Sequence, residues 1–530
     1  MNKKLLFTIL FFIFSITFLF LLFGKIAYLD SFGDEQENLV AGWLISQGLV
    51  PYKDFFFHHA PLPFFLSSLF FPWAKANPEL LRTVIFSLFL GAYSLLYWLV
   101  SRRFTFAVFL TFMLFALSAP MLSLHMFLAD TIGTLSLLVI VAATLSYVLD
   151  RKPNLFILLL MYVIATWVAF WSSVTLLIPI GFMFLAVLLV TRKELFSLGK
   201  QKVLLLGALF STLHLSFPIY FFIKGAFLDF YWSVFTYNTK YYFPLRLADG
   251  QGELQYGFVF RLINQFSLYL SRNAVSLFQA VYTFVLTLKT IILTAAFNLA
   301  PRNLSDHIGV ALREFLNAFS SPELGSFTLL LLLFFSLILR KKFLWGFSLI
   351  LFAFTLRVRD NGLFHLSPYY LVIFFFTSAM IYVAVQERQR ITAVAFIATL
   401  VLAVNAFFPS YITSVSQKLP MIDCSLTPKA ELVKQYTSKQ NPLLLIGGNT
   451  AYYLLTDTMP SHKWFYFYPW FHGVPQIAEA MTENVAQKIP EAIIIEGYDG
   501  SSDSSSHYAP ELIELVNQHY RYVGDGVYVR

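Results

Sequence analysis

The sequence is poor in charged residues and has a single cysteine, and both shortages narrow the possibilities. Only 12% of the 530 residues are charged, whereas 58% are hydrophobic and 61 are phenylalanine. A soluble globular domain is about one-quarter charged. The single cysteine, Cys424, cannot form an intramolecular disulfide, so any folded part outside the cell must be stable through packing alone. The composition therefore excludes an ordinary soluble protein and indicates a membrane protein.

The patterns of nucleotide, nucleic-acid and metal binding are also missing. Gly447 and Gly448 follow an apolar run but complete neither G-x-G-x-x-G nor G-x-x-x-x-G-K-[ST], and glycines at the end of a strand explain them as well. The net charge of +8 comes mostly from short basic clusters between apolar runs, which argues against nucleic-acid binding. His58 and His59 are adjacent and lack the i, i+4 spacing of two ligands on one helix face, so we predict no metal and no cofactor.

Apolar runs that approach the length of a membrane span are abundant. About 20 apolar residues cross a hydrocarbon core of roughly 30 Å. We expect crossings at residues 5–23, 83–100, 104–117, 131–149, 155–170, 175–190, 203–223, 327–339, 343–356, 368–385 and 391–408. The predicted fold class is a polytopic α-helical membrane protein with about eleven or more spans.

Basic residues set the expected orientation of these spans. Lysines lie within residues 2–4, and the apolar run that follows has no small-residue cleavage motif, so we expect a retained span with a cytoplasmic N-terminus. Alternation then places the basic clusters at 102–103, 151–152 and 192–202 on the inside. This agrees with the positive-inside rule.

Three parts of the chain are expected outside the membrane. The predicted membrane domain, residues 1–408, includes an external loop at 24–78 and an external or interfacial region at 224–323. An even number of crossings in that region keeps the later basic clusters inside, which favours interfacial helices or a hairpin. From residue 409 to 530 the long apolar runs end, and we predict a small external α/β domain. Its expected elements are strands at 443–446 and 492–495 and a helix at 511–520.

The external loop at 24–78 gathers polar residues directly after the first span. Asp34 and Glu35 open it, and a short amphipathic helix is predicted at 37–48, lying in the interface. A carboxylate at the edge of a low-dielectric region gains proton affinity, so it can act as a base or orient a hydroxyl. Ordinary solvated acids would give the same pattern. Four more polar residues follow, suited to contacts with an anionic headgroup or within the loop: Lys53, Asp54, His58 and His59.

Two more polar groups are predicted on the same side of the membrane. Asp130 opens the apolar helix LADTIGTLSLL, where it either serves a task at membrane depth or caps the helix. Arg357 and Arg359 lie in a short loop that alternation makes external, where arginine is uncommon, and His365 follows. Arginine suits bidentate phosphate binding, although a surface pair of Arg359 with Asp360 is the plainer explanation.

The stretch GDEQENLVAGWLISQGLVPYKDFFFHHAPLPFFL contains an acidic pair, then a G-x-x-P-Y-x-D-F segment, then a Pro-Leu turn. In this order it resembles the first external loop of the GT-C membrane glycosyltransferases, especially the bacterial relatives of protein O-mannosyltransferases and of the lipid A aminoarabinose transferase. LADTIGTLSLL resembles their second acidic motif, FHLSPYYLV their late motif, and IGGNTAYYLL with MPSHKWFYFYP their external domain. WSSVTLLIP departs from a segment that often carries a basic residue in relatives, because Ser172 and Ser173 stand there.

The resemblance implies a glycosyltransferase that moves a hexose or pentose from a polyprenyl-phosphate donor to a protein, lipid or glycan acceptor on the extracytoplasmic face. Basic side chains would stabilise the charge that develops on the departing phosphate. The catalytic residues that it implies are Asp34, Glu35 and Asp130. The contacts to the donor phosphate that it implies are Arg357, Arg359, His365 and Lys53. The contacts left to the acceptor or the loop are Asp54, His58 and His59.

Two other functions fit a chain of this kind. A membrane transporter or lipid flippase also needs many spans and buried charges, but the hydropathy pattern shows no internal repeat and no matching pair of Gly- or Pro-broken spans. A non-catalytic scaffold could keep the fold without the activity. The joint presence of Asp34, Glu35 and Asp130 argues against that reading.

Overall fold

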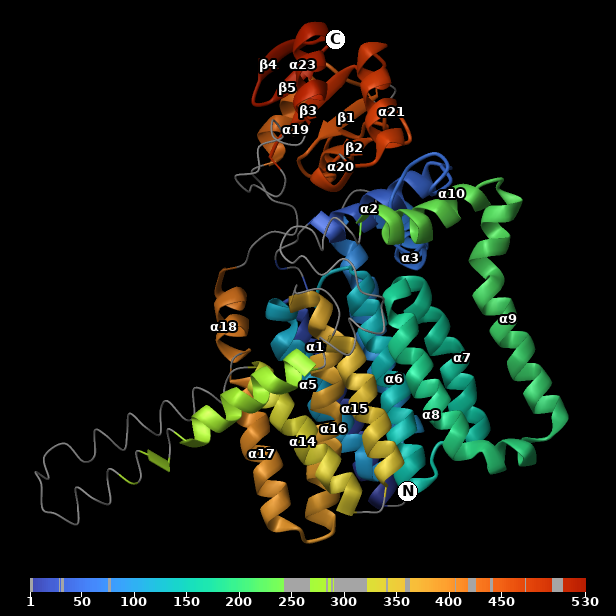
Figure 1. The fold of residues 1–530 in the computed structure, drawn as a ribbon, viewed down its shortest axis with the longest axis vertical. Helices are drawn as coiled ribbons and strands as arrows, with labels where there is room; N and C mark the ends of the chain where they lie inside the picture. The colour runs from blue at the N-terminus through green and yellow to red at the C-terminus, as the bar shows by residue number, and fades with distance from the viewer. Residues whose placement is uncertain are drawn as a thin grey trace, which may run out of the picture.

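The chain forms a bundle of helices with a small α/β domain above one end (Figure 1). The computed structural model describes residues 3–27, 29, 33–74, 78–242, 267–282, 285–286, 289, 322–339, 342–357, 363–405, 407–417, 426–438, 442–471, 473–497 and 509–530. A layer of shorter helices lies between the bundle and the α/β domain (Figure 1). Its members are α2 (Gly33–Ser46), α3 (Leu62–Ala74) and α10 (Phe227–Tyr231).

The long apolar runs form the helices of the bundle, as predicted. In the described part of the chain, seven helices are long and apolar enough to cross a membrane. They are α1 (Lys3–Gly24), α4 (Arg82–Leu99), α5 (Thr105–Leu122), α6 (Ala129–Asp150), α7 (Leu155–Ser172), α9 (Lys200–Ile223) and α16 (Ser367–Gln386). The other predicted runs also form helices, but with shorter apolar stretches: α8 (Leu177–Leu195), α14 (Pro322–Leu339), α15 (Phe343–Arg357) and α17 (Arg390–Val404). The polytopic helical class is therefore confirmed, while about eleven crossings stays a prediction.

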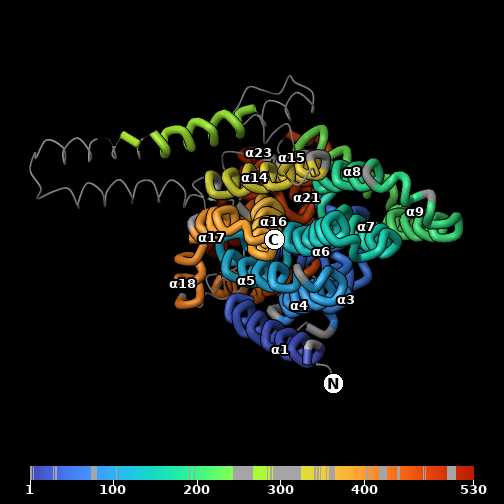
Figure 2. The backbone as a smooth tube through the Cα atoms, turned by 90° about the horizontal axis from the view of Figure 1, so that it is seen from below, coloured from blue at the N-terminus to red at the C-terminus, as the bar shows by residue number. Residues whose placement is uncertain are grey.

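Helices α6 and α16 form the centre of the bundle (Figure 2). In the most apolar stretch of α6, 94% of the residues are buried, because α4, α7 and α16 pack around this helix. In the most apolar stretches of α1 and α9, only 11% of the residues are buried. These two helices lie at the periphery and turn apolar side chains outward. Such an outward apolar face is what a lipid-facing helix presents.

The two ends of the bundle differ in charge. The connections from α6 to α7, from α8 to α9 and from α16 to α17 lie at the end away from the α/β domain (Figure 1). These connections carry the basic clusters around Arg151, Arg192 and Arg388. The clusters that alternation placed together therefore share one end, and which side of the membrane that end faces stays a prediction.

The helix predicted at 37–48 is present but differs from the expectation. It is α2, which begins at Gly33, and every residue from Glu35 to Leu44 is buried. It packs against α3 on one side and against α20 (Ala451–Thr456) of the α/β domain on another. The expected amphipathic character is therefore wrong, because two elements distant in the sequence cover the helix, and its place in the membrane interface stays a prediction.

The region predicted to be external or interfacial at 224–323 is described only in part. It begins with α10 and continues as the π-helix η5 (Trp232–Tyr242), and residues 267–282 are helical. The interfacial helices or hairpin expected in this region fall largely outside the described residues. The number of crossings there stays a prediction.

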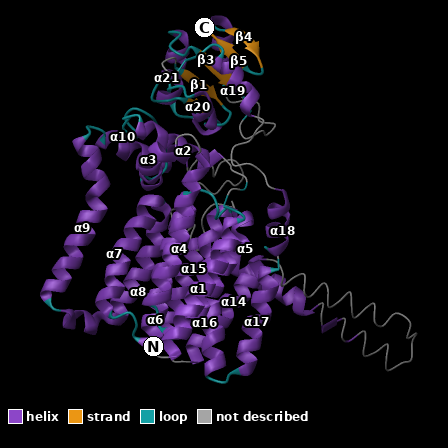
Figure 3. Ribbon diagram, turned by 180° about the vertical axis from the view of Figure 1, so that it is seen from behind, coloured by secondary structure: helices purple, strands orange, loops and turns teal. Residues whose placement is uncertain are grey.

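The α/β domain is built on a five-stranded sheet with the order β2-β1-β3-β5-β4, and it contains all the strands that the structure describes (Figure 3). Strand β1 pairs in parallel with β2 and with the central strand β3, and β5 is antiparallel to β3 and β4. The strands are β1 (Leu443–Ile446), β2 (Tyr466–Phe467), β3 (Ala492–Ile495), β4 (Arg521–Gly524) and β5 (Val527–Val529).

The predictions for this domain are confirmed where the apolar pattern was clear. The strands expected at 443–446 and 492–495 are β1 and β3, and the expected helix is α23 (Pro510–His519). Helix α18 (Phe408–Gln417) packs against α5, and the Tyr411 hydroxyl donates to the Leu22 carbonyl at 3.2 Å. The bundle thus continues past the expected boundary at residue 408, and the division into domains stays a prediction.

We predict that Gly42→Ala destabilises the contact between α2 and α3. A Cβ at Gly42 would lie 2.1 Å from Ser67 Oγ and 2.8 Å from the Ser67 carbonyl carbon, so the helices must separate. Overpacking of this kind costs about 1–3 kcal/mol. The matched control is Gly91→Ala in α4, where a Cβ meets nothing within 4 Å. Thermal unfolding in detergent should show a loss for the first variant alone, and equal behaviour of the two would contradict the prediction.

Candidate active site

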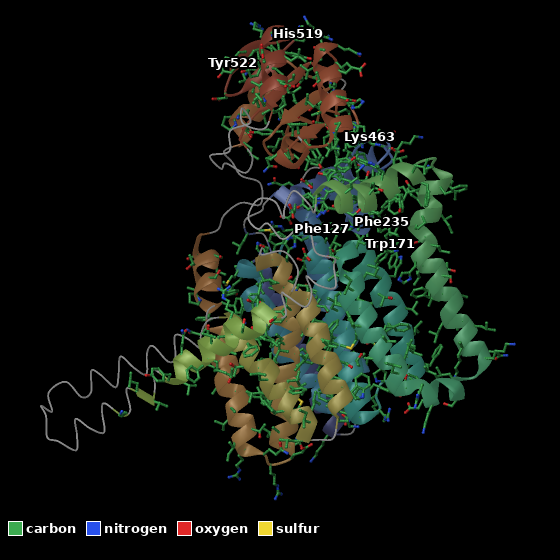
Figure 4. The ribbon with its side chains drawn as sticks, in the orientation of Figure 1. Phe127, Trp171, Phe235, Lys463, His519 and Tyr522 are labelled. Atoms are coloured by element: carbon green, nitrogen blue, oxygen red, sulfur yellow. The ribbon has the colours of Figure 1, made fainter. Side chains whose placement is uncertain are left out.

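Helix α2 turns its acidic residues in two directions. Asp34, Glu37 and Asn38 are spaced i, i+3 and i+4 and share one face, whereas Glu35 points away from it. The Asn38 amide donates to the Phe127 carbonyl at 3.0 Å, which ties this face to the residues before α6. Phe127 lies between the bundle and the layer of shorter helices (Figure 4).

Glu35 forms a buried ion pair with Arg82 at the start of α4. Both side chains are fully buried, and Nε of Arg82 donates to Oε1 of Glu35 at 2.8 Å while Nη2 donates to Oε2. The main-chain N–H of Phe127 also donates to Oε1, at 2.6 Å. The remaining guanidinium nitrogen donates to the carbonyls of Ala27 and Leu29. The pair therefore joins the end of α1, α2, the start of α4 and the residues before α6.

Sequence reasoning missed Arg82, although a signal was present. The residue directly precedes an apolar run and lies at its predicted outer end. An arginine there breaks the positive-inside pattern, as Arg357 and Arg359 do, and such exceptions need a partner.

Asp130 pairs with His365, a residue 235 positions later. Nδ1 of His365 lies 2.9 Å from Oδ2 of Asp130, and the side chains are 24% and 8% exposed. One turn further along α6, the hydroxyls of Thr134 and Ser367 lie 3.1 Å apart. The N-cap of α6 is Leu128, with no side-chain cap. The carboxylate therefore serves the contact with His365 and does not occupy the capping position.

Glu37 pairs with His59 in the same region. Nε2 of His59 lies 3.4 Å from Oε2 of Glu37, and the side chains are 30% and 5% exposed. Burial by itself lowers the pKa of the His59 imidazole, but nearby carboxylates outweigh burial and raise this pKa above its usual value. These carboxylates are, in order of effect, Glu37, Asp34 and Asp130.

The result is a cluster of three carboxylates and two imidazoles drawn from four parts of the chain: α2, residues 55–59, α6 and the short 3-10 helix η7 (Leu363–Leu366) that precedes α16. In both pairs the imidazole is more exposed than its carboxylate. Each carboxylate thus lies behind an imidazole that it orients. Within the described ranges, no group of three or more His, Cys, Asp or Glu side chains is arranged to hold a metal ion.

The other predicted site residues lie elsewhere. The Lys53 side chain is exposed and its Nζ donates to the Lys224 carbonyl at 3.4 Å. Oδ2 of Asp54 accepts from the Val50 N–H at 2.7 Å and closes a turn. Arg359 and the side chain of Arg357 are outside the described part, so the predicted phosphate contacts from that loop stay predictions.

His58 is buried and stacks on its neighbour. Its ring lies 4.2 Å from the His59 ring and 4.6 Å from the Tyr242 ring, measured between centroids. These ring contacts place His58 beside His59 in the same segment.

Comparisons with known proteins add one structural likeness. No protein-family model matches the sequence, and no curated protein matches it. Among solved structures, the fold is similar to the crystal structure of ArnT from Cupriavidus metallidurans in the apo state, at 11% sequence identity. The match covers 85% of this chain and 84% of that chain with a TM-score of 0.49.

We predict that Glu35→Gln lowers the free energy of unfolding by about 3–5 kcal/mol, because it leaves the Arg82 guanidinium buried without a counter-charge. The control is Glu431→Gln, which breaks the exposed pair of Glu431 with Lys434 and should change the free energy by about 0–1 kcal/mol. Chemical denaturation in detergent measures both. Equal, small losses would show that the buried pair does not hold the layer in place.

We predict that His59 stabilises the fold most strongly at acidic pH. Because its folded-state pKa is raised, the stabilisation is full below the ordinary value of 6.5 and is lost as the pH rises through the folded-state pKa. The difference in melting temperature between wild type and His59→Gln should therefore shrink from pH 6 toward pH 9. His519→Gln, on the distant helix α23, is the control. A difference that is constant or grows with pH would contradict the prediction.

Proposed function

We propose that the protein is a membrane glycosyltransferase that moves a sugar from a polyprenyl-phosphate donor to a hydroxyl or amine of a protein, lipid or glycan. The observation that supports this most is the cluster of Asp34, Glu37 and Asp130 with His59 and His365 at one end of a membrane bundle. It offers a carboxylate to take a proton and cations to meet a phosphate. The resemblance of the acidic loop to the GT-C transferases supports the same reaction.

The proposed step is a single displacement at the anomeric carbon. Asp34 accepts the proton of the acceptor, whose oxygen or nitrogen forms a bond to that carbon. The bond from the carbon to the phosphate oxygen breaks, and its electron pair leaves with the polyprenyl phosphate. Asp34 suits the role of base because it is half-buried on the face of α2 that also carries Glu37, whereas the Glu35 carboxylate forms an ion pair with Arg82.

The two imidazoles contact the leaving phosphate. His365 is oriented by Asp130 and His59 by Glu37, and neither imidazole is deeply buried. The nearby carboxylates raise the pKa of His59, so this imidazole supplies positive charge there. Charge that is fixed before the reaction stabilises the transition state without reorganisation. His365 and Asp130 were expected to serve the phosphate and the acid chemistry separately. In this proposal they act as one unit, and Glu35 anchors α2 in place of a direct catalytic role.

The position of the cluster agrees with a lipid-linked donor. It lies at the end of the bundle that carries the α/β domain, away from the basic clusters around Arg151, Arg192 and Arg388. By the positive-inside rule, the cluster is then extracytoplasmic and the N-terminus cytoplasmic in a cell membrane. A polyprenyl chain could remain in the bilayer while its phosphate reaches the cluster.

A transporter or lipid flippase is the alternative function. It would use the same charged cluster to bind a lipid phosphate and move it unchanged. The two readings differ in chemistry, since only a transferase consumes the lipid-linked sugar.

We predict that Asp34→Asn abolishes most transfer from a radiolabelled polyprenyl-phosphate hexose by protein purified into lipid, with a fall of about 100-fold or more, because a general base typically contributes 10²–10⁴-fold. Asp130→Asn should also lower the rate, since His365 loses its anionic partner. The control is Asp525→Asn in the β4–β5 turn, where φ is 47° and asparagine fits. Transfer that survives Asp34→Asn would remove Asp34 from the mechanism, and movement of the intact donor without transfer would favour the flippase.

A further inference from the structure

The main chain from Phe56 to His59 forms hydrogen bonds with three partners. The Phe56 N–H donates to the Lys463 carbonyl of the α/β domain at 2.9 Å. The Asn238 side-chain amide of η5 donates to the His58 carbonyl at 2.7 Å. From within the same loop, the Tyr52 hydroxyl donates to the His59 carbonyl at 2.8 Å. The contacts to Lys463 and Asn238 tie the segment to two elements that are distant in the sequence, and none of the three involves a side chain of the carboxylate cluster.

The π-helix η5 holds its side of this segment with packed rings. Asn238 also donates to the Val234 carbonyl at 2.9 Å, so its amide is fixed on the helix. The fully buried Tyr237 ring lies 5.2 Å from Phe56 and 5.7 Å from His58, between centroids. A π-helix is a rare conformation and often marks a functional region. Here it places Asn238 and Tyr237 on the same short segment.

The α/β domain is joined to this helix as well as to the segment. Nζ of Lys463 forms an ion pair with Asp229 of α10, the element directly before η5. The Trp464 ring lies 4.6 Å from Phe56 and 5.7 Å from Trp232. Lys463 lies at the junction of the α/β domain with the layer of shorter helices (Figure 4). The domain, η5 and the segment therefore form one connected unit.

We propose that Asn238 and Lys463 are positioning residues for transfer, which fix residues Phe56–His59 so that the His59 imidazole stays among the site carboxylates. The inference rests on the proposed function and extends it to the α/β domain. This domain contributes no side chain to the cluster, but it fixes the position of His59. The charged groups that face His59 are Asp34 and Glu37 from α2 and Asp130 from α6, with His58 beside it. A shift of the segment changes its distance to all of them.

The first test compares Asn238→Leu with Thr239→Val. Leucine keeps the approximate shape of asparagine but cannot donate, and Thr239 is exposed on the same helix with its hydroxyl bonded to the Phe235 carbonyl. We expect Asn238→Leu to lower kcat about 10- to 100-fold with a smaller change in KM for the donor, as small misplacements of a reacting group do. Thr239→Val should behave like wild type. An unchanged kcat for Asn238→Leu in folded protein would overturn the proposal.

A double-variant cycle separates positioning from general stability. If Asn238 acts through His59, then Asn238→Leu lowers the rate much less in the His59→Gln background than in wild type. The pH–rate profile of Asn238→Leu should also lose the titration that His59 contributes in the wild type. Full, additive losses in the cycle would show a merely structural role and would overturn the proposal.

The ion pair offers a rescue experiment. Asp229→Lys and Lys463→Asp should each lower kcat and raise hydrogen exchange of the amides at 52–59, and the double exchange of charges should restore both. Single variants that leave exchange and rate unchanged, or a double variant no better than the singles, would overturn the role of Lys463. Absence of transfer by wild type contradicts the proposed function itself, whereas wild-type transfer that is insensitive to these variants contradicts this inference alone.

Discussion

The ion pair of Glu35 with Arg82 is the contact on which the site depends. Both side chains are fully buried, so each needs the other to offset the loss of hydration. Because Glu35 points away from the face of α2 that carries Asp34, Glu37 and Asn38, its anchoring sets the rotation of that helix and turns this face toward the cluster. The two neighbouring acids therefore have different positions, since Glu35 anchors the helix and Asp34 lies on the face that carries Glu37.

The two His–carboxylate pairs give the site a mixed charge that suits transfer between a neutral acceptor and a charged leaving group. Glu37 and Asp130 lie behind His59 and His365 and are more deeply buried than they are. The imidazoles are therefore the more exposed members of the two pairs, and Asp34 lies on the same face of α2 as Glu37. A site with only carboxylates would repel a phosphate, and a site with only cationic side chains would lack a proton acceptor. The arrangement satisfies both needs within one low-dielectric region.

Much of the fold could be predicted from the sequence, because apolar runs report helices and strands directly. The eleven expected runs all form helices, and β1 and β3 lie where Leu443–Ile446 and Ala492–Ile495 indicate. The acidic loop was also found, because charge is rare in this chain. The pairings were not, since Glu35 meets Arg82 across 47 positions and Asp130 meets His365 across 235. A local sequence pattern does not show which distant side chains meet. For the same reason it did not show that the α/β domain covers α2.

Helix α9 connects the site to the bilayer itself. Its mostly apolar residues, 203–223, span about 32 Å, close to a hydrocarbon core of roughly 30 Å, so its tilt depends on the thickness of the membrane. It lies at the edge of the bundle against α7, where Trp167 Nε1 donates to the Ser216 hydroxyl at 3.3 Å, and it leads directly into α10, which carries Asp229 (Figure 1). A thinner or thicker bilayer changes that tilt and moves the base of α10. The thickness of the membrane thereby affects the position of the segment that carries His59.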